Sequence, residues 1–438
     1  MKIEIKNGRL IDPATNRNEN ASLYIADGVV VGMGGEPSIS DGSEASTGEA
    51  LRDFTPDKVI DASGKIVCPG LVDLCARLRE PGFEYRATLE SEMRAAVAGG
   101  VTSLVCPPDT DPALDEPGLV EMLKRRATMA NLARVYPLGA LTLGLKGEKL
   151  AEMTELHEAG CVGFFQADHP IRDTMVLYRA LQYAATFGYT VWLRPQEAYL
   201  AADGIAHDGE VSTRLGLAGI PVSAETVAIA TITTLMRETG AKVHLARISS
   251  AAGVELVRLA KSAGLPLSCD VGIHHLLLTD RDIGYFDSQY RFTPPLRSPT
   301  DRDALSRAVI DGTIDAICSD HTPHDDDAKH VPFGEAEAGA TALETLLSLT
   351  LKWADNQQVP LPLALKKITS DPARVVDLKA GQFLRGAAAD VCIFNPQSFW
   401  VITAKTLMSQ GKNTPYLGRE LQGKVTHTLV NGQLVFPS

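Results

Sequence analysis

The chain has 438 residues, with 42 basic and 54 acidic side chains, which give a formal net charge of −12 at pH 7. This length allows one large domain and a smaller one, and the acidic balance argues against nucleic acid or anionic membrane as partners. Seven scattered cysteines without a Cys-x-x-Cys pair argue against a disulfide framework or a thiolate zinc cage. We expect a cytoplasmic protein without a signal peptide or membrane span.

The first 62 residues alternate apolar and polar side chains in MKIEIKNGRLID and SLYIADGVVVGMG, a pattern that predicts β-strands. After these two stretches, the segment 36–58 is rich in Ser, Gly and acidic residues, which favours a solvated loop. Residues 384–438 again show alternating strands, in ADVCIFNP and KVTHTLVNGQLVF. We expect the two ends, 1–62 and 384–438, to pair into one small β-sandwich domain.

Between these ends a unit of short apolar strand, loop and helical segment recurs eight times. The predicted strands are 65–76, 101–106, 133–141, 161–166, 189–194, 242–248, 266–271 and 314–320. Four of the predicted helices, 88–100, 148–160, 223–240 and 253–264, end in glycine, as helix C-termini often do. The alternation predicts an α/β fold, with residues 63–383 forming a (β/α)8 TIM barrel.

Active sites of such barrels lie at the C-terminal ends of the strands, so the residues found there are candidate catalytic groups. The strand ends and the loops after them carry Cys75, Arg77, Arg79, Asp109, Gln166, Ala167, Arg194, Arg247, His274, His275, Asp320, His321 and His324. Arginine cannot ligate a metal, because the guanidinium stays protonated and has no free lone pair. Three such cations around one cavity would also repel a divalent ion, so we expect a site without metal.

Several segments resemble dihydroorotases, the cyclic amidohydrolases of pyrimidine biosynthesis, and the similarity covers almost the whole chain. These segments are PGLVDLCARLREPGFEYRATLESEMRAAVAGGVTSLV, GEVSTRLGLAGIPVSAE, HHLLLTD, TPPLRSPTDRDAL, DGTIDAICSDHTPH, ALETLLSL and KNTPYLG. The resemblance implies that Arg79 and His324 match substrate contacts, and that Asp109 stands where the family usually has asparagine. It also implies that Cys75, Arg77, Gln166, Ala167, Arg194 and Arg247 replace residues of the family's zinc site.

Asp320 is the one ligand position that keeps the residue of the family, in which this aspartate also shuttles a proton. Zinc lowers the pKa of bound water from 15.7 to about 7, so losing it forfeits nucleophile activation on the order of 10 kcal/mol. We therefore expect Asp320 to pair with one or more of Arg77, Arg194 and Arg247. For Cys75, a buried space-filling thiol is a simpler interpretation than a nucleophile.

The resulting hypothesis is a pseudoenzyme that needs no cofactor. By family analogy it would be a structural or assembly partner of aspartate transcarbamoylase, within an oligomer or hetero-oligomer. The alternative is an active cyclic amidohydrolase that interconverts dihydroorotate and carbamoyl aspartate. It would use either a zinc ion held by Asp320, Cys75 and His274 or His275, or metal-free chemistry on a different substrate.

Overall fold

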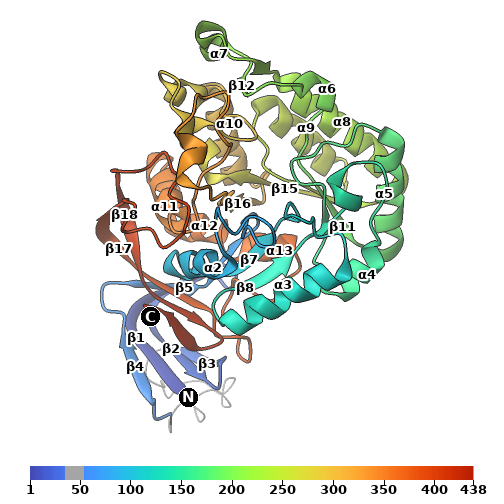
Figure 1. Cartoon of the computed structure of the whole chain (residues 1–438). Helices are drawn as coiled ribbons and strands as arrows, with labels where there is room; N and C mark the ends of the chain where they lie inside the picture. Colours follow the sequence, from blue (N-terminus) through green and yellow to red (C-terminus); the bar gives the residue numbers. More distant parts are fainter. Residues whose placement is uncertain (35–53, 438) are drawn as a thin grey trace.

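The structure, a computed structural model, describes residues 1–34 and 54–437 of the chain. Its larger part is a parallel barrel surrounded by helices (Figure 1). The barrel strands are β6 (Leu71–Asp73), β7 (Val101–Cys106), β8 (Arg134–Pro137) with β9 (Gly139–Ala140), β10 (Phe164–Phe165), β11 (Thr190–Leu193), β14 (Lys242–Leu245), β15 (Leu267–Gly272) and β16 (Ala316–Cys318). Backbone hydrogen bonds between residues 75–77 and His321 close the barrel between β6 and β16.

Helices follow the barrel strands, as the repeating pattern predicts (Figure 1). They are α2 (Leu89–Ala98), α3 (Pro117–Ala130), α4 (Met153–Glu158), α5 (Thr174–Phe187), α8 (Val222–Thr239), α9 (Ala251–Ser262), α10 (Pro299–Asp311), α11 (Leu346–Asn356), α12 (Leu361–Lys366) and α13 (Ser370–Val375). Two short helices and two short strands lie between β11 and α8, namely α6 (Ala198–Ala201), β12 (Ala206–His207), α7 (Glu210–Leu215) and β13 (Gly219–Ile220).

Some predicted elements differ from the observed ones, and the strand expected at 133–141, for example, is divided at Leu138 into β8 and β9. The strand expected at 65–76 is divided at Gly70 into β5 (Ile66–Pro69), which joins the terminal sheet, and β6, which joins the barrel. A Cβ atom on Gly70 would lie 2.2 Å from the hydroxyl of Thr102, so only glycine fits at this crossing point. The helix expected at 148–160 begins only at Met153, because Lys149 and Ala151 make backbone bonds with Leu143 and Leu141 instead.

The two chain ends form one eight-stranded sheet beside the barrel (Figure 1). Its path is β19 (Gln433–Phe436), β18 (Glu420–Val430), β17 (Val391–Val401), β5, β1 (Lys2–Asp12), β2 (Arg17–Ala26) and β3 (Val29–Gly34), with β4 (Lys58–Asp61) paired to β1. Buried side chains from both ends of the chain share one apolar core, including Ile3, Leu23 and Ile393. The predicted fold class, a TIM barrel with a small β domain built from both termini, is confirmed.

We retain the division of the chain at residues 62 and 384 as a proposal, with β5 as the strand through which the barrel segment enters the terminal sheet. Residues 36–53 of the predicted solvated loop lie outside the described residues. Within the described part of the chain, no helix is both long and apolar enough to cross a membrane.

Candidate active site

Three buried arginines meet at the C-terminal ends of three barrel strands. Arg77 follows β6, Arg194 follows β11 and Arg247 follows β14, and their side chains are 6%, 4% and 1% exposed. All three bind the carboxylate of Asp168, which lies in the loop after β10 and is 28% exposed. We call Arg77, Arg194, Arg247 and Asp168 the arginine cluster.

Both carboxylate oxygens of Asp168 are engaged in this cluster. Oδ1 accepts from Nε of Arg194 and from Nη2 of Arg247, each at 2.5 Å, and Oδ2 accepts from Nη2 of Arg77 at 2.7 Å. Burial alone would raise the pKa of Asp168, but the charges of Arg247, Arg194 and Arg77 outweigh it and hold this pKa well below its usual range. Asp168 is therefore an anion throughout the physiological range.

Asp320 binds the guanidinium groups of Arg77 and Arg247 through Nη atoms that do not contact Asp168. Its Oδ1 atom accepts from Nη1 of Arg247 at 2.9 Å and from Nη1 of Arg77 at 3.2 Å. Two of the three arginines expected to pair with Asp320 do so, whereas Arg194 binds Asp168 instead. Asp320 is thus a buried carboxylate held between two cations.

Asp109, the acidic residue at the position where the resemblance implies asparagine, is also neutralised locally. Its Oδ2 atom accepts from Nε of Arg77 at 2.7 Å. Burial would raise the pKa of Asp109, but Arg77 more than compensates and lowers it. The three guanidinium groups of the arginine cluster are therefore balanced by three carboxylates, those of Asp109, Asp168 and Asp320.

Arg79 and His324 lie together at the rim of the site. Nε of Arg79 donates to the backbone oxygen of Pro323 at 2.9 Å, and its Nη2 atom lies 3.4 Å from Nε2 of His324. His324 also contacts the backbone oxygen of Ala338 through Nε2, at 2.9 Å. Burial, assisted by the charge of Arg79, lowers the pKa of His324 to about 2, so this imidazole is neutral.

Cys75 and Gln166 occupy two further positions of the implied zinc site and make local contacts. Sγ of Cys75 lies 3.6 Å from Oδ1 of Asp320, and burial raises the pKa of this thiol well above its ordinary value, so it is not an activated nucleophile. Gln166 accepts from the hydroxyl of Thr142 at 2.9 Å and donates to the backbone oxygen of Leu145 at 2.8 Å. Gln166 thus fixes the neighbouring loop.

The histidines near the strand ends have structural partners. His274 lies 3.3 Å from the hydroxyl of Tyr416, and His275 contacts the backbone oxygen of Pro294 at 3.0 Å. Burial lowers the pKa of His274 to about 3 and that of His275 to about 4. His321 pairs with Glu92 at 2.6 Å through Nε2 and accepts from the backbone N–H of Ala342 through Nδ1.

Four site residues other than glycine have a left-handed backbone conformation. They are Arg79, Ala167, Arg247 and Asp320, with φ of 64°, 51°, 60° and 50°. Such conformations cost on the order of 1–3 kcal/mol each and persist where the surrounding structure enforces them. The Nε atom of Arg247 is also buried without a hydrogen-bond partner among the described residues.

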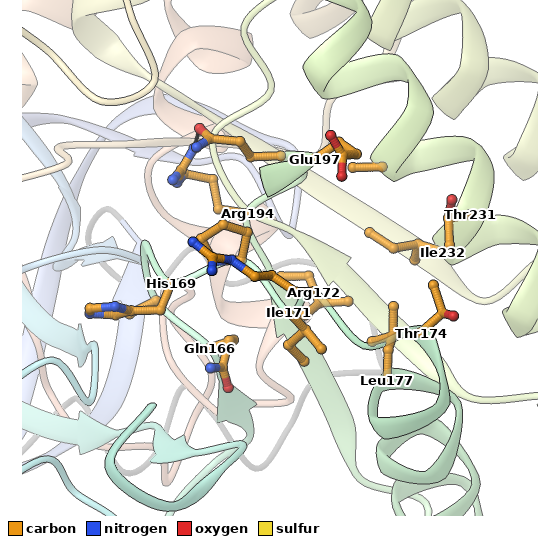
Figure 2. A pocket seen from close by; sticks show the side chains of 15 residues that line it. Gln166, His169, Ile171, Arg172, Thr174, Leu177, Arg194, Glu197, Thr231 and Ile232 are labelled. Carbon is orange, nitrogen blue, oxygen red and sulfur yellow. Dashed lines mark hydrogen bonds between the residues drawn. The ribbon is translucent and has the colours of Figure 1, made fainter. Parts of the chain in front are cut away.

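A cavity opens beside the arginine cluster, between α5 and α8 (Figure 2). Arg194 lines its inner end, and Arg172 and His169 lie on the same side of the view, while Ile232 and Leu177 form an apolar wall opposite them. The cavity volume is about 90 Å³, smaller than the roughly 300–1,000 Å³ of typical small-molecule sites. Arg194 is the residue of the arginine cluster that lines this cavity.

Comparison with known proteins identifies the family. Residues 64–252 match the family described as dihydro-orotase-like, and residues 196–435 match the amidohydrolase family. A dihydroorotase-like protein of Pseudomonas aeruginosa is 42% identical over 99% of both chains. A dihydroorotase of Geobacter sp. is 39% identical over 100% of this chain and 99% of its own. The chain belongs to the dihydroorotase-like family.

Solved structures of this family's fold superpose along nearly the whole chain. The L-hydantoinase (dihydropyrimidinase) of Arthrobacter aurescens has a TM-score of 0.85 at 24% identity, covering 99% of this chain and 95% of its own. A D-hydantoinase structure has a TM-score of 0.80 at 21% identity, again covering 99% and 95%. These likenesses support the barrel and the terminal β domain.

The prediction that this family member is a pseudoenzyme is wrong. Relatives that are 39% and 40% identical over nearly their full lengths, from Geobacter sp. and Anaeromyxobacter dehalogenans, are named dihydroorotase. The sequence argument counted only missing zinc ligands. We expected Asp320 to act as a counter-ion of the arginines, but a buried carboxylate can also transfer a proton, and the guanidinium groups around it can stabilise negative charge.

The zinc site implied by the resemblance does not fit the side chains at its positions. Arg77, Arg194 and Arg247 offer only N–H donors, and Asp320 is already bound by two of them. Among the described residues, no group of three or more His, Cys, Asp and Glu side chains could hold a metal ion. The open alternative of one ion between Asp320, Cys75 and a histidine therefore lacks a convergent donor set.

Sequence reasoning missed Asp168, which binds more of these arginines than any other residue. It lies two residues beyond Gln166, just past the end of the predicted fourth strand. Charge counting could have found it, because three buried cations at strand ends require nearby anions and Asp109 and Asp320 supply only two.

Proposed function

We propose that the protein is a slow cyclic amide hydrolase of the dihydroorotase type, which interconverts dihydroorotate and carbamoyl aspartate without a resident metal ion. The observation that carries this proposal is the full-length similarity to proteins named dihydroorotase, in a chain that retains Asp320 at the end of β16. In this proposal, Asp320 and the charged groups around it bind the substrate carboxylate, transfer the proton and stabilise the negative charge during ring opening.

Arg79 is the proposed anchor for the substrate carboxylate. A planar guanidinium can donate two parallel hydrogen bonds to a carboxylate, and only one of its donors is committed to the backbone oxygen of Pro323. The neutral His324 beside it adds a dipole without a competing positive charge. Since Arg77 already neutralises Asp109, that carboxylate does not repel an acidic substrate with its full charge.

Asp320 is the proposed proton carrier. It would take a proton from the attacking water as the C–O bond forms at the ring carbonyl, and pass that proton to the ring nitrogen as the C–N bond breaks. Negative charge develops on the carbonyl oxygen in between, and the guanidinium groups of Arg77 and Arg247 are the nearby cations that can stabilise it. Every atom and proton of the hydrolysis is accounted for by water and Asp320.

The proposed rate is low for a physical reason. Metal binding makes water more acidic by about nine pKa units, and each unit corresponds to about 1.36 kcal/mol. One oxyanion donor contributes about 2.7–4 kcal/mol in enzymes where it has been removed. Two guanidinium groups therefore recover only part of the activation that a zinc-bound hydroxide provides.

The test is turnover of dihydroorotate and of carbamoyl aspartate by purified protein whose metal content has been measured. Turnover that persists after chelation and disappears in Asp320→Asn supports the proposal. Turnover that rises in proportion to bound zinc contradicts its metal-free part, and turnover unaffected by Asp320→Asn contradicts the role of Asp320.

The association with aspartate transcarbamoylase stays a prediction based on family analogy. The oligomeric state and the cytoplasmic location also stay predictions. Co-purification of the two proteins at their natural expression levels is the direct measurement. A stable complex supports the association, and separate elution of both proteins at micromolar concentration contradicts it.

A further inference from the structure

Asp168, whose carboxylate binds all three arginines, is the most accessible residue of the arginine cluster. The side chain of Asp168 is 28% exposed, whereas those of Arg77, Arg194 and Arg247 are almost fully buried. The cations are fixed on three separate strand ends, while Asp168 lies in the loop that leads to α5. The guanidinium groups thus form a rigid receptor, and the carboxylate is its exchangeable part.

We propose that Arg77, Arg194 and Arg247 form a binding site for a small carboxylate, and that Asp168 occupies this site as an internal ligand which an external carboxylate can replace. The chemical class of the ligand follows from the contacts. The receptor offers N–H donors from three directions to two oxygen atoms, which a planar carboxylate of formate or acetate size can accept as Asp168 does.

Two further observations indicate a ligand at this place. Arg247 keeps a buried Nε–H group without an acceptor among the described residues, so the receptor has donor capacity that Asp168 does not use. A small cavity lined by Arg194, Arg172 and His169 lies beside the cluster (Figure 2). Its apolar wall, including Leu177 and Ile232, suits a ligand with a short hydrocarbon body.

Charge balance explains why replacement is feasible. The three guanidinium groups face the three carboxylates of Asp109, Asp168 and Asp320, so moving Asp168 into solvent leaves one uncompensated buried cation. An incoming carboxylate restores the balance. Ala167, the residue before Asp168, has a left-handed backbone conformation with φ of 51°.

That the natural ligand is the carboxylate formed when the dihydroorotate ring opens rests on the proposed function, but the receptor itself does not. The experiment therefore uses acetate and needs no turnover. Asp168→Ala in the full chain is melted at increasing sodium acetate, with sodium chloride at matched ionic strength as reference. At about ten times its dissociation constant, a ligand specific to the folded state shifts the folding equilibrium about 11-fold.

We expect acetate to cause a saturable rise in the melting temperature of Asp168→Ala. The unsubstituted protein should show no such rise at the same low concentrations. Combining Asp168→Ala with Arg247→Met should abolish the effect. A rise with acetate no larger than with chloride overturns the proposal. If Asp168→Ala is not obtained in folded form, the variant is dissolved in urea and diluted into buffer with or without acetate, and the amount of folded protein is compared. Recovery of folded protein only with acetate supports the receptor, and equal recovery contradicts it.

Failure of this inference and failure of the proposed function give different results. Acetate rescue without dihydroorotate turnover supports the carboxylate receptor and rejects the hydrolase. Turnover without acetate rescue supports the hydrolase and rejects the receptor.

Discussion

Nη1 of Arg247 lies 2.9 Å from Oδ1 of Asp320, so the end of β14 is bound to the end of β16, past the intervening strand β15. Both residues have a left-handed backbone conformation, and both side chains are almost fully buried. This pair places a fixed cation against the carboxylate that we assign as proton carrier.

The first prediction concerns this carboxylate. Asp320→Asn keeps the shape of the side chain but cannot accept a proton, so we expect dihydroorotate turnover to fall by about 10²–10⁴-fold, the range of general acid–base catalysis. Steady-state kinetics with matched circular dichroism spectra measure the effect. Asp311→Asn, at the exposed end of α10, is the control and should leave kcat unchanged. Equal losses in both variants would contradict the assignment.

The second prediction concerns the substrate anchor. Arg79→Lys keeps the charge but loses the planar pair of donors, so we expect KM for dihydroorotate to rise more than kcat falls. Arg281→Lys, at a residue outside the strand-end site, is the matched control. An unchanged KM in Arg79→Lys would remove Arg79 from the binding site.

The third prediction compares the carboxylate of the arginine cluster with an exposed one. Asp168→Asn leaves three buried guanidinium groups short of a counter-charge, and we expect a loss of about 3–5 kcal/mol in the free energy of unfolding. Asp311→Asn breaks a surface pair with Arg258, for which we expect about 0–1 kcal/mol. Urea denaturation of both variants measures the difference. Similar losses in the free energy of unfolding would show that Asp168 stabilises the protein no more than a surface ion pair does.

The fourth prediction is the pH dependence that this cluster causes. Because the pKa of Asp168 is lowered by folding, its contribution to stability is complete above the unfolded pKa of about 3.9 and is lost as pH falls toward the lowered native value. We expect the unsubstituted protein to lose stability more steeply below pH 4 than Asp168→Asn. Urea midpoints between pH 3 and pH 7 test this, and parallel curves would contradict it.

The fifth prediction addresses metal. The donor set around Asp320 does not fit zinc, so we expect substoichiometric zinc after purification and the same melting temperature with and without EDTA. A variant with histidine at 75, 77, 194 and 247 and aspartate at 166 should gain zinc binding, measured by elemental analysis. Partner groups that orient the ligands also matter, so this variant should bind weakly. Stoichiometric zinc in the unsubstituted protein would contradict the prediction.

Periodicity predicted the eight barrel strands because each is a short apolar run between turn residues. It could not locate the division at Gly70, since the two parts, 66–69 and 71–73, are equally apolar and differ only in which sheet they join. The helix at 148–160 was too long because tertiary hydrogen bonds of Lys149 and Ala151 override its helical pattern.

The candidate site was predicted as far as residue type allows. The strand-end positions of Arg77, Arg194, Arg247 and Asp320 follow from the barrel pattern. The pairing of Arg194 with Asp168 does not, because Asp168 lies in a loop whose path depends on the backbone of Ala167. The error about activity arose from treating zinc ligands as the only source of catalysis.

The most direct test of this account is dihydroorotate hydrolysis by the unsubstituted protein and by Asp320→Asn, both freed of metal by chelation. We expect slow but measurable hydrolysis by the unsubstituted protein and none by the variant. Hydrolysis that is absent from both, or equal in both, would contradict it.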